Sequence, residues 1–397
     1  MERWDLMRNI DTKMDFSSIS ILTLLVLFLS PMLLAFGNIG TICVFVCILS
    51  LLLFSLVIKK DFLDKATQKQ YNKIILSFYM YIMWLFIAMI WGGIDFVSII
   101  RIVQFVGCAS AFSLAAKYPF RPSHFKAVYL LIELELMVCV LFWLYSKCPV
   151  FNYAFFYTNP NVFAMILLSW IVIFSLKREK KLMDKIALIL CIFFLIFTTA
   201  RATIVSMGVF VFYNYFVDKS KMDINKTIIS ILMYFEVLII IFMILMYTNL
   251  PNTELGNQLQ VFSVTHFHKN FFSGRHMVWK SLLQYIKAKP YIGYGLATVP
   301  SSLIGNIKYS SHNIYIQTAI QMGLIGVFFL IMIFNSIICM CANNHSNSMR
   351  SIVLTFMFIL IFHECFEITL TQNLVSIGLV SWFIMGIGCN FRINQNW

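Results

Sequence analysis

The chain has 397 residues, of which 60% are hydrophobic and only 12% are charged, and its formal net charge is +13. Soluble domains average about 45–50% apolar and about 25% charged residues, so this composition excludes a soluble globular protein and predicts an all-helical integral membrane protein. No basic soluble domain holds the excess charge, which therefore indicates membrane topology and attraction to headgroups rather than nucleic-acid binding.

Twelve apolar segments are candidate spanning helices, because one span needs about 20 mostly apolar residues. They lie near 18–36, 39–58, 74–92, 96–116, 127–145, 162–176, 186–200, 202–217, 227–248, 313–341, 351–369 and 373–390. The ten cysteines lie mostly inside these runs and form no CxxC pair, so they predict packing rather than disulfides. No internal repeat or pair of broken helices suggests an inverted-repeat transporter.

Lys and Arg residues are concentrated in every second connection between these spans. With the N- and C-termini in the cytoplasm, most basic residues fall in the cytoplasmic connections, whereas the outside turns at 37–38, 92–95 and 370–372 hold none. We therefore expect one polytopic membrane domain over 1–397, with a large extracytoplasmic loop at 249–312.

The centre of this loop, "GRHMVWKSLLQYIKAKP", has the pattern of an amphipathic helix. Its apolar face comprises Val278, Leu282, Tyr285 and Ile286. Pro290 and the "YIGYG" turn should end the helix. Such a helix can lie on the membrane surface.

Two arginines need an explanation, since charged groups inside or at the edge of spans are costly. Arg201, in "FTTARATIV", separates two predicted spans at the outer face, and Arg275 opens the loop helix. Guanidinium groups bind phosphate oxygens in a bidentate manner and stay charged when partly desolvated. The alternative is that each extends to the lipid headgroups.

His312 stands at the start of a long predicted helix. The positive end of the helix dipole disfavours an imidazolium there, and a neutral imidazole can serve as a general base. Asn313, Gln317 and Gln321 follow at i, i+4 and i+8 and form a polar stripe. This stripe can line a cavity and bind sugar hydroxyls, or it can hold helices together.

Two further residues are candidates for lining a cavity. Arg101 lies inside a predicted span and can pair with Asp95, and Glu367 belongs to "HECFE" near the outer end of a span. His266 and His268 lack further ligands at the spacing of a metal site, so no metal is expected. The P-loop, GxSxG and HExxH motifs are absent from the sequence.

The pattern His312-Asn313, nine residues, Gly323, two residues, Gly326 resembles the signature of the O-antigen ligase and Wzy-type polymerase superfamily. The stretches "GRHMVWKSLLQYIKAKPYIGYG" at 274–295, "TTAR" at 198–201 and "YTNPNVFAMIL" at 157–167 are similar to its arginine loop, its arginine hairpin and an NPN-containing helix start. The resemblance covers roughly 155–330, and Ala200 stands where the family often has Ser.

The resemblance implies a GT-C-like, metal-independent, inverting glycosyltransferase of the bacterial cytoplasmic membrane, without a cofactor and with its active site on the outer face. Arg201 and Arg275 would bind the diphosphate of an undecaprenyl-diphosphate-linked oligosaccharide, and His312 would activate the acceptor hydroxyl. The first expectation is a polymerase of capsule or exopolysaccharide repeat units, working with flippase and chain-length regulator proteins. The alternatives are a ligase acting on an acceptor that is not lipid-linked and, less favoured, a transporter of lipid-linked oligosaccharides.

Overall fold

The computed structural model describes residues 16–33, 36–57, 65–157, 159–214, 226–267, 270–305, 310–344, 349–372 and 375–391, and within these ranges all regular structure is helical. The helices are α2 (Phe16–Leu33), α3 (Asn38–Val57), α4 (Lys65–Gly92), α5 (Phe96–Lys117), α6 (Pro122–Tyr145), α7 (Pro160–Leu176), α8 (Leu182–Thr198), α9 (Arg201–Phe212), α10 (Lys226–Asn249), α11 (Glu254–Phe267), α12 (Arg275–Ala288), α13 (Pro300–Ile304), α14 (Ile314–Asn343), α15 (Arg350–His363) and α16 (Val375–Gly388). A short 3-10 turn, Leu250–Asn252, joins α10 to α11.

Every predicted span falls on one of these helices, namely α2–α10 and α14–α16. Among the described residues, five helices are long and apolar enough to cross a membrane: α3, α4, α5, α6 and α14. A sixth results if α10 and α11, which meet at a bend of 85°, count as one broken span. The protein is therefore an α-helical membrane protein, while the count of twelve spans stays a prediction.

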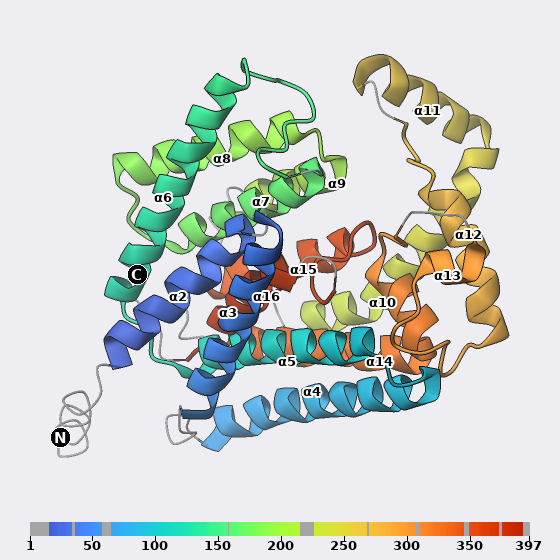
Figure 1. Ribbon diagram of the computed structural model, residues 1–397, viewed down its shortest axis with the longest axis horizontal. Helices are drawn as coiled ribbons and strands as arrows, with labels where there is room; N and C mark the ends of the chain where they lie inside the picture. The colour runs from blue at the N-terminus through green and yellow to red at the C-terminus, as the bar shows by residue number, and fades with distance from the viewer. Residues whose placement is uncertain are drawn as a thin grey trace.

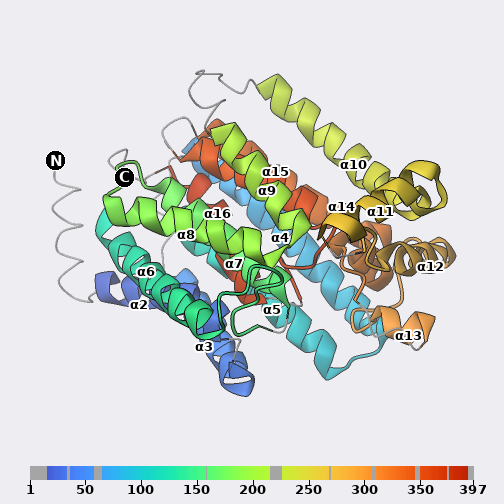
Figure 2. The same ribbon diagram turned by 90° about the horizontal axis from the view of Figure 1, so that it is seen from above.

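Two views show where the loop elements lie (Figures 1 and 2). Helix α4 packs against both α5 and α14, and these long helices run along the longest axis of the molecule. Helices α11, α12 and α13 gather at the end of the molecule where α4 ends and α14 begins.

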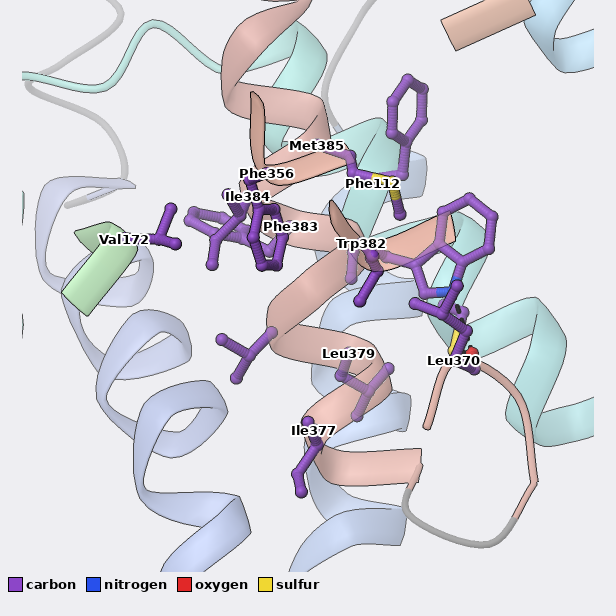
Figure 3. Close-up of a cluster of buried hydrophobic side chains, with 14 of the residues drawn as sticks. Phe112, Val172, Phe356, Leu370, Ile377, Leu379, Trp382, Phe383, Ile384 and Met385 are labelled. Carbon is purple, nitrogen blue, oxygen red and sulfur yellow. Dashed lines mark hydrogen bonds between the residues drawn. The ribbon is translucent and has the colours of Figure 1, made fainter. Parts of the chain in front are cut away.

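Helix α16 forms the centre of the bundle. All 14 of its residues are buried, and a helix that is apolar on every side requires neighbours all around it. Figure 3 shows its side chains among Phe112 of α5, Val172 of α7 and Phe356 of α15. The Trp382 indole N–H donates to the carbonyl oxygen of Leu370, at 2.9 Å.

Helix α14 breaks at Gly323, whose φ is 67° and ψ −175°. The break receives the turn at 290–295: the Leu324 N–H donates to the Pro290 carbonyl at 2.7 Å, and the Tyr294 N–H donates to the Ile320 carbonyl at 2.8 Å. A Cβ atom on Gly323 would overlap the carbonyl group of Tyr291. Glycine is therefore required here both by backbone conformation and by space. The apolar pattern of this segment, which predicts one continuous helix, does not reveal the break.

Helix α12 packs along α14 through Val278, Leu282, Ile316 and Ile320, which form one apolar cluster. At the start of both helices, the Trp279 indole N–H donates to the Ser311 carbonyl at 2.6 Å. The turn after α12 also meets α14 at its break. The two helices therefore run side by side in the same direction between these two contacts. The apolar face of α12 therefore contacts α14, so the protein covers the face that the sequence allowed to contact the membrane surface.

Candidate active site

A cavity of about 650 Å³ lies where α12 and α14 begin. Arg201, Arg275, His312 and Glu367 all line it, although they come from four separate segments of the chain. The other polar side chains on its wall are Asn152, Asn159, Asn161, Thr199, Thr203, Ser273, Ser310 and His363.

Four helices begin at this cavity. Its wall includes residues from the first turns of α7 and α9, the start of α12, and His312 just before α14. Helix N-termini carry roughly half a positive charge each and expose N–H groups that lack an intrahelical acceptor. Helices α9 and α12 begin after Ala200 and Gly274, and no side chain caps either end. This arrangement favours an anionic ligand, most of all beside the two arginines.

Arg201 is the first residue of α9 and binds both α11 and the segment that follows it. Its guanidinium donates to the Ser263 hydroxyl at 2.9 Å, to the Asn270 carbonyl at 2.9 Å and to the Ser273 hydroxyl at 3.2 Å. It also lies over the Phe271 ring, 5.7 Å from the centroid. These contacts fix the position of the guanidinium at the cavity wall.

Glu367 lies in the connection after α15 and joins three elements. Its Oε1 accepts from the Arg275 guanidinium and from the Asn161 amide, both at 2.7 Å, and its Oε2 lies 3.0 Å from Nδ1 of His312. Burial raises the pKa of this carboxyl, but the hydrogen bond to His312 and the charge of Arg275 hold the pKa below its ordinary value. Glu367 is therefore a buried carboxylate with three polar contacts, two of them from the donors of Asn161 and Arg275. The helix ends at His363 rather than at 369 as predicted, which leaves Glu367 outside it.

His312 has a φ of 46°, a left-handed conformation that costs a residue with a side chain roughly 1–2 kcal/mol. Asn313 follows and caps α14, since its side chain accepts from the Ile316 N–H at 2.9 Å. The side chain of His312 is 26% exposed and faces the cavity, with only Nδ1 bonded among the described residues. Its Nε2 is thus open to a ligand.

A second imidazole, that of His363, also lines the cavity. It is fully buried, its Nε2 lies 3.2 Å from the Thr203 hydroxyl, and its Nδ1 has no hydrogen-bond partner among the described residues. Thr203 and Asn161 are not among the residues singled out from the sequence, and of the "HECFE" segment only Glu367, not His363, is predicted to line a cavity. The "NPN" helix start and the "HECFE" segment were the available signals, but neither shows which cavity these side chains reach.

The amide stripe of α14 does not line this cavity, although that was one of its two predicted roles. Gln317 and Gln321 each donate to the carbonyl of Thr298, at 3.1 and 3.0 Å, and Gln321 exchanges hydrogen bonds with Gln372. Asn313 donates to the Cys365 carbonyl at 2.9 Å. All three stripe residues are buried, and they join α14 to the large loop and to the connection after α15.

Arg101 is also absent from the cavity wall. Its guanidinium donates to the carbonyl of Leu296, directly after the "YIGYG" turn. Asp95, its predicted partner, instead caps α5 by accepting from the Ser98 N–H at 2.6 Å. Arg101 therefore holds the loop in place, because a half-buried guanidinium needs an acceptor and the residue after the turn supplies one.

The other side of the cavity is apolar. Met243 and Met246 from the end of α10 and Leu250 of the 3-10 turn line it together with Val205 of α9 and Leu259 of α11. The described residues contain no group of three His, Cys, Asp or Glu that could hold a metal ion, and His268 lies outside them. The cavity thus combines a cationic wall, an imidazole with an open nitrogen and an apolar side.

Comparison with known proteins gives one family. The model of the O-antigen ligase family matches residues 186–331, and a search of curated proteins finds no match. The matched range contains Arg201, Arg275, His312 and the signature glycine Gly323, while Glu367 lies beyond it. The match confirms the resemblance to the O-antigen ligase and Wzy polymerase superfamily and supports a membrane function of that type.

Proposed function

Because residues 186–331 match the O-antigen ligase family, we propose that this protein is a polysaccharide repeat-unit polymerase. It would transfer an oligosaccharide from undecaprenyl diphosphate to a hydroxyl of another lipid-linked repeat unit. The observation that carries the proposal is that Arg201, Arg275 and His312 line one cavity at the start of four helices. A departing diphosphate requires cations and oriented N–H groups, and an attacking hydroxyl requires a base.

Arg201 and Arg275 bind the diphosphate of the donor in this proposal. Each guanidinium has donors beyond those used in its present contacts, and a planar fork matches the geometry of phosphate oxygens. The N–H groups of the uncapped α9 and α12 starts add to this binding. Together they stabilise the negative charge that develops as the sugar departs, and no metal is needed for that task.

His312 takes the proton of the acceptor hydroxyl at Nε2. The hydroxyl oxygen then forms a bond to the anomeric carbon, while the bond from that carbon to the phosphate oxygen breaks. The electron pair leaves with undecaprenyl diphosphate, and a single displacement inverts the configuration. The isoprenoid chain would lie along the apolar side formed by Met243, Met246 and Leu250.

The proposal includes the finer topology predicted from the sequence: a single GT-C-like domain of twelve spans with cytoplasmic termini. The cavity would then open on the outer face of a bacterial cytoplasmic membrane. A flippase would supply repeat units to that face, and a chain-length regulator would limit the polymer. The product would be capsular or exopolysaccharide.

A ligase is the second candidate, because the matching family model carries that description. Both activities use the same donor chemistry and differ in the acceptor. Purified protein in liposomes can be given a synthetic undecaprenyl-diphosphate repeat unit, alone or with a sugar acceptor that carries no lipid. A ladder of lipid-linked oligomers from the repeat unit alone indicates a polymerase, whereas transfer only to the added acceptor indicates a ligase.

The site assignment is tested in the same assay by His312→Ala, which should reduce the rate by about 10²–10⁴-fold, the usual contribution of a general base. Arg178→Ala, in the connection between α7 and α8, is the matched control and should retain full activity. Normal transfer by the His312→Ala variant would show that His312 is not the base. Flipping of the intact lipid-linked unit, without any transfer by the wild type, would indicate a transporter instead.

A further inference from the structure

We propose that Glu367 is a positioning residue that fixes the tautomer of His312, an inference that rests on the proposed function of His312 as a base. The observation is the set of three contacts on one carboxylate: Arg275 and Asn161 on Oε1, and Nδ1 of His312 on Oε2. Among the residues described as lining the cavity, Glu367 is the single acidic one.

The chemistry of the carboxylate determines the hydrogen position on the imidazole. An ionised carboxylate only accepts hydrogen bonds, so the Nδ1 atom 3.0 Å from Oε2 must carry a hydrogen. The neutral imidazole then has its lone pair on Nε2, the nitrogen that a hydroxyl in the cavity would meet. A carboxylate in this place also stabilises the imidazolium that forms when His312 takes the proton.

The surroundings of Glu367 keep it ionised and in place. Its Oε1 receives two short hydrogen bonds, from α7 and from the first residue of α12, and the side chain is 9% exposed. Burying a carboxylate is costly unless donors satisfy it, and here the donors also hold its orientation. The acid thus links the diphosphate-binding Arg275 to the base, in a position that lies 55 residues from His312 along the chain.

Glu367→Gln tests this role with almost no change of shape. The two donors on Oε1 would retain the amide oxygen, which leaves the amide NH₂ facing His312. That NH₂ group can only donate, so Nδ1 becomes an acceptor and the hydrogen moves to Nε2. The imidazole is then in the wrong tautomer for accepting a proton. In serine proteases the corresponding Asp→Asn change lowers kcat by about 10⁴-fold.

The experiment combines kinetics with a measurement that does not depend on activity. The wild type, Glu367→Gln and Glu364→Gln are reconstituted with ¹⁵N-labelled histidine, and the tautomer of His312 is determined by NMR, with His312→Asn used to assign its signal. Glu364 is the matched control: it lies in the same connection and is buried, but its carboxylate accepts from Thr369 and does not line the cavity. The donor KM and kcat are measured with the lipid-linked repeat unit.

We expect Glu367→Gln to move the hydrogen of His312 from Nδ1 to Nε2 and to lower kcat by about 10³–10⁴-fold, with the donor KM changed less than about threefold. Glu364→Gln should leave the tautomer and kcat at their wild-type values. An unchanged tautomer, or a kcat close to that of the wild type, would overturn the role of Glu367. If Glu367→Gln does not fold, Glu367→Asp keeps a carboxylate and must retain the Nδ1–H tautomer.

These outcomes separate the two proposals. If the wild type transfers no sugar to any acceptor, the proposed function fails, while the NMR result still decides whether Glu367 sets the tautomer. If His312→Ala is inactive and Glu367→Gln is fully active, the function stands and Glu367 has only a structural role.

Discussion

Arg275 is shared between the protein and the proposed ligand. One of its N–H groups is used by Glu367, at 2.7 Å, and its side chain is 17% exposed at the cavity. Arg275→Lys keeps the charge but replaces the planar fork by a single nitrogen, so it cannot bind two phosphate oxygens side by side while it bonds Glu367. We expect kcat/KM for the donor to fall by about 10–100-fold, in line with the loss of one charge-assisted hydrogen bond.

The measurement is a titration of the lipid-linked donor at fixed protein concentration. Arg350→Lys is the control, because Arg350 lies at the opposite end of α15 from the cavity residue His363. Wild-type kcat/KM in the Arg275→Lys variant would indicate that Arg275 acts as a point charge and not as a fork.

Single residues of the site differ in how well the sequence predicts them. Arg201, Arg275 and His312 are identifiable because charged and imidazole groups at the ends of apolar helices are costly and need a reason. The roles of Asn161 and His363 cannot be identified from the sequence, because the residues that they contact are distant in the chain. Asn161 meets its carboxylate partner 206 residues away, and no local pattern reports that distance.

At the scale of elements, the junction between the "YIGYG" turn and the break in α14 can be tested at Gly323. Gly323→Ala places a Cβ atom against the carbonyl group of Tyr291 and forces alanine to a φ of 67°. We expect unfolding in detergent at a lower temperature, with a loss of at least about 1–3 kcal/mol, and reduced transfer. Gly208→Ala is the control, since no atom lies within 4 Å of the position that its Cβ would take and alanine favours a helix.

The amide stripe permits a second test, because its contacts indicate a structural role. Gln321→Leu removes the hydrogen bonds to Thr298 and Gln372 and leaves the half-buried Gln372 amide without this partner. We expect a loss of about 1–3 kcal/mol in stability, measured by thermal unfolding, with kcat within about threefold of the wild type. Unchanged stability together with a collapse of kcat would instead indicate that the stripe binds substrate.

The sequence predicts the elements better than their contacts. The period of α12 identified its apolar face correctly, but not the surface that covers it, since Ile316 and Ile320 of α14 are as apolar as lipid. The amides of α14 left two roles open because a donor in an apolar helix needs an acceptor of any kind. The acceptor for Gln317 and Gln321 is the Thr298 carbonyl, which belongs to the large loop and not to a neighbouring span. A pattern within the helix cannot predict an acceptor from another part of the chain.

At the scale of the whole molecule, the predicted topology assigns opposite sides to two exposed connections. In a background that lacks the two exposed cysteines, Cys148→Ser with Cys339→Ser, Ser301→Cys in α13 should react with a membrane-impermeant maleimide added to intact cells. Glu179→Cys, between α7 and α8, should react only after the membrane is opened. Both positions are exposed, so a difference in labelling reports sidedness rather than burial. The reverse pattern would place the cavity on the cytoplasmic side.

Hydropathy located the helices along the chain but not their depth in the bundle. Helix α16 is enclosed on every side, whereas α4 has many exposed apolar residues, and both are strongly apolar in sequence. Lipid and protein interior favour the same side chains, so composition alone does not distinguish a central helix from a peripheral one. The arrangement of the bundle therefore depends on contacts between helices that hydropathy does not report.

The parallel course of α12 and α14 makes the site sensitive to insertions and deletions in either helix. The turn after α12 is joined to the break in α14 by backbone hydrogen bonds, so the distance along each helix from this junction to the cavity is fixed by the number of residues between them. One residue inserted into α12 would turn Arg275 by about 100° around the helix axis and shift it by about 1.5 Å. Natural variation in length should therefore be rare within 275–290 and 311–323, the two stretches between the junction and the cavity.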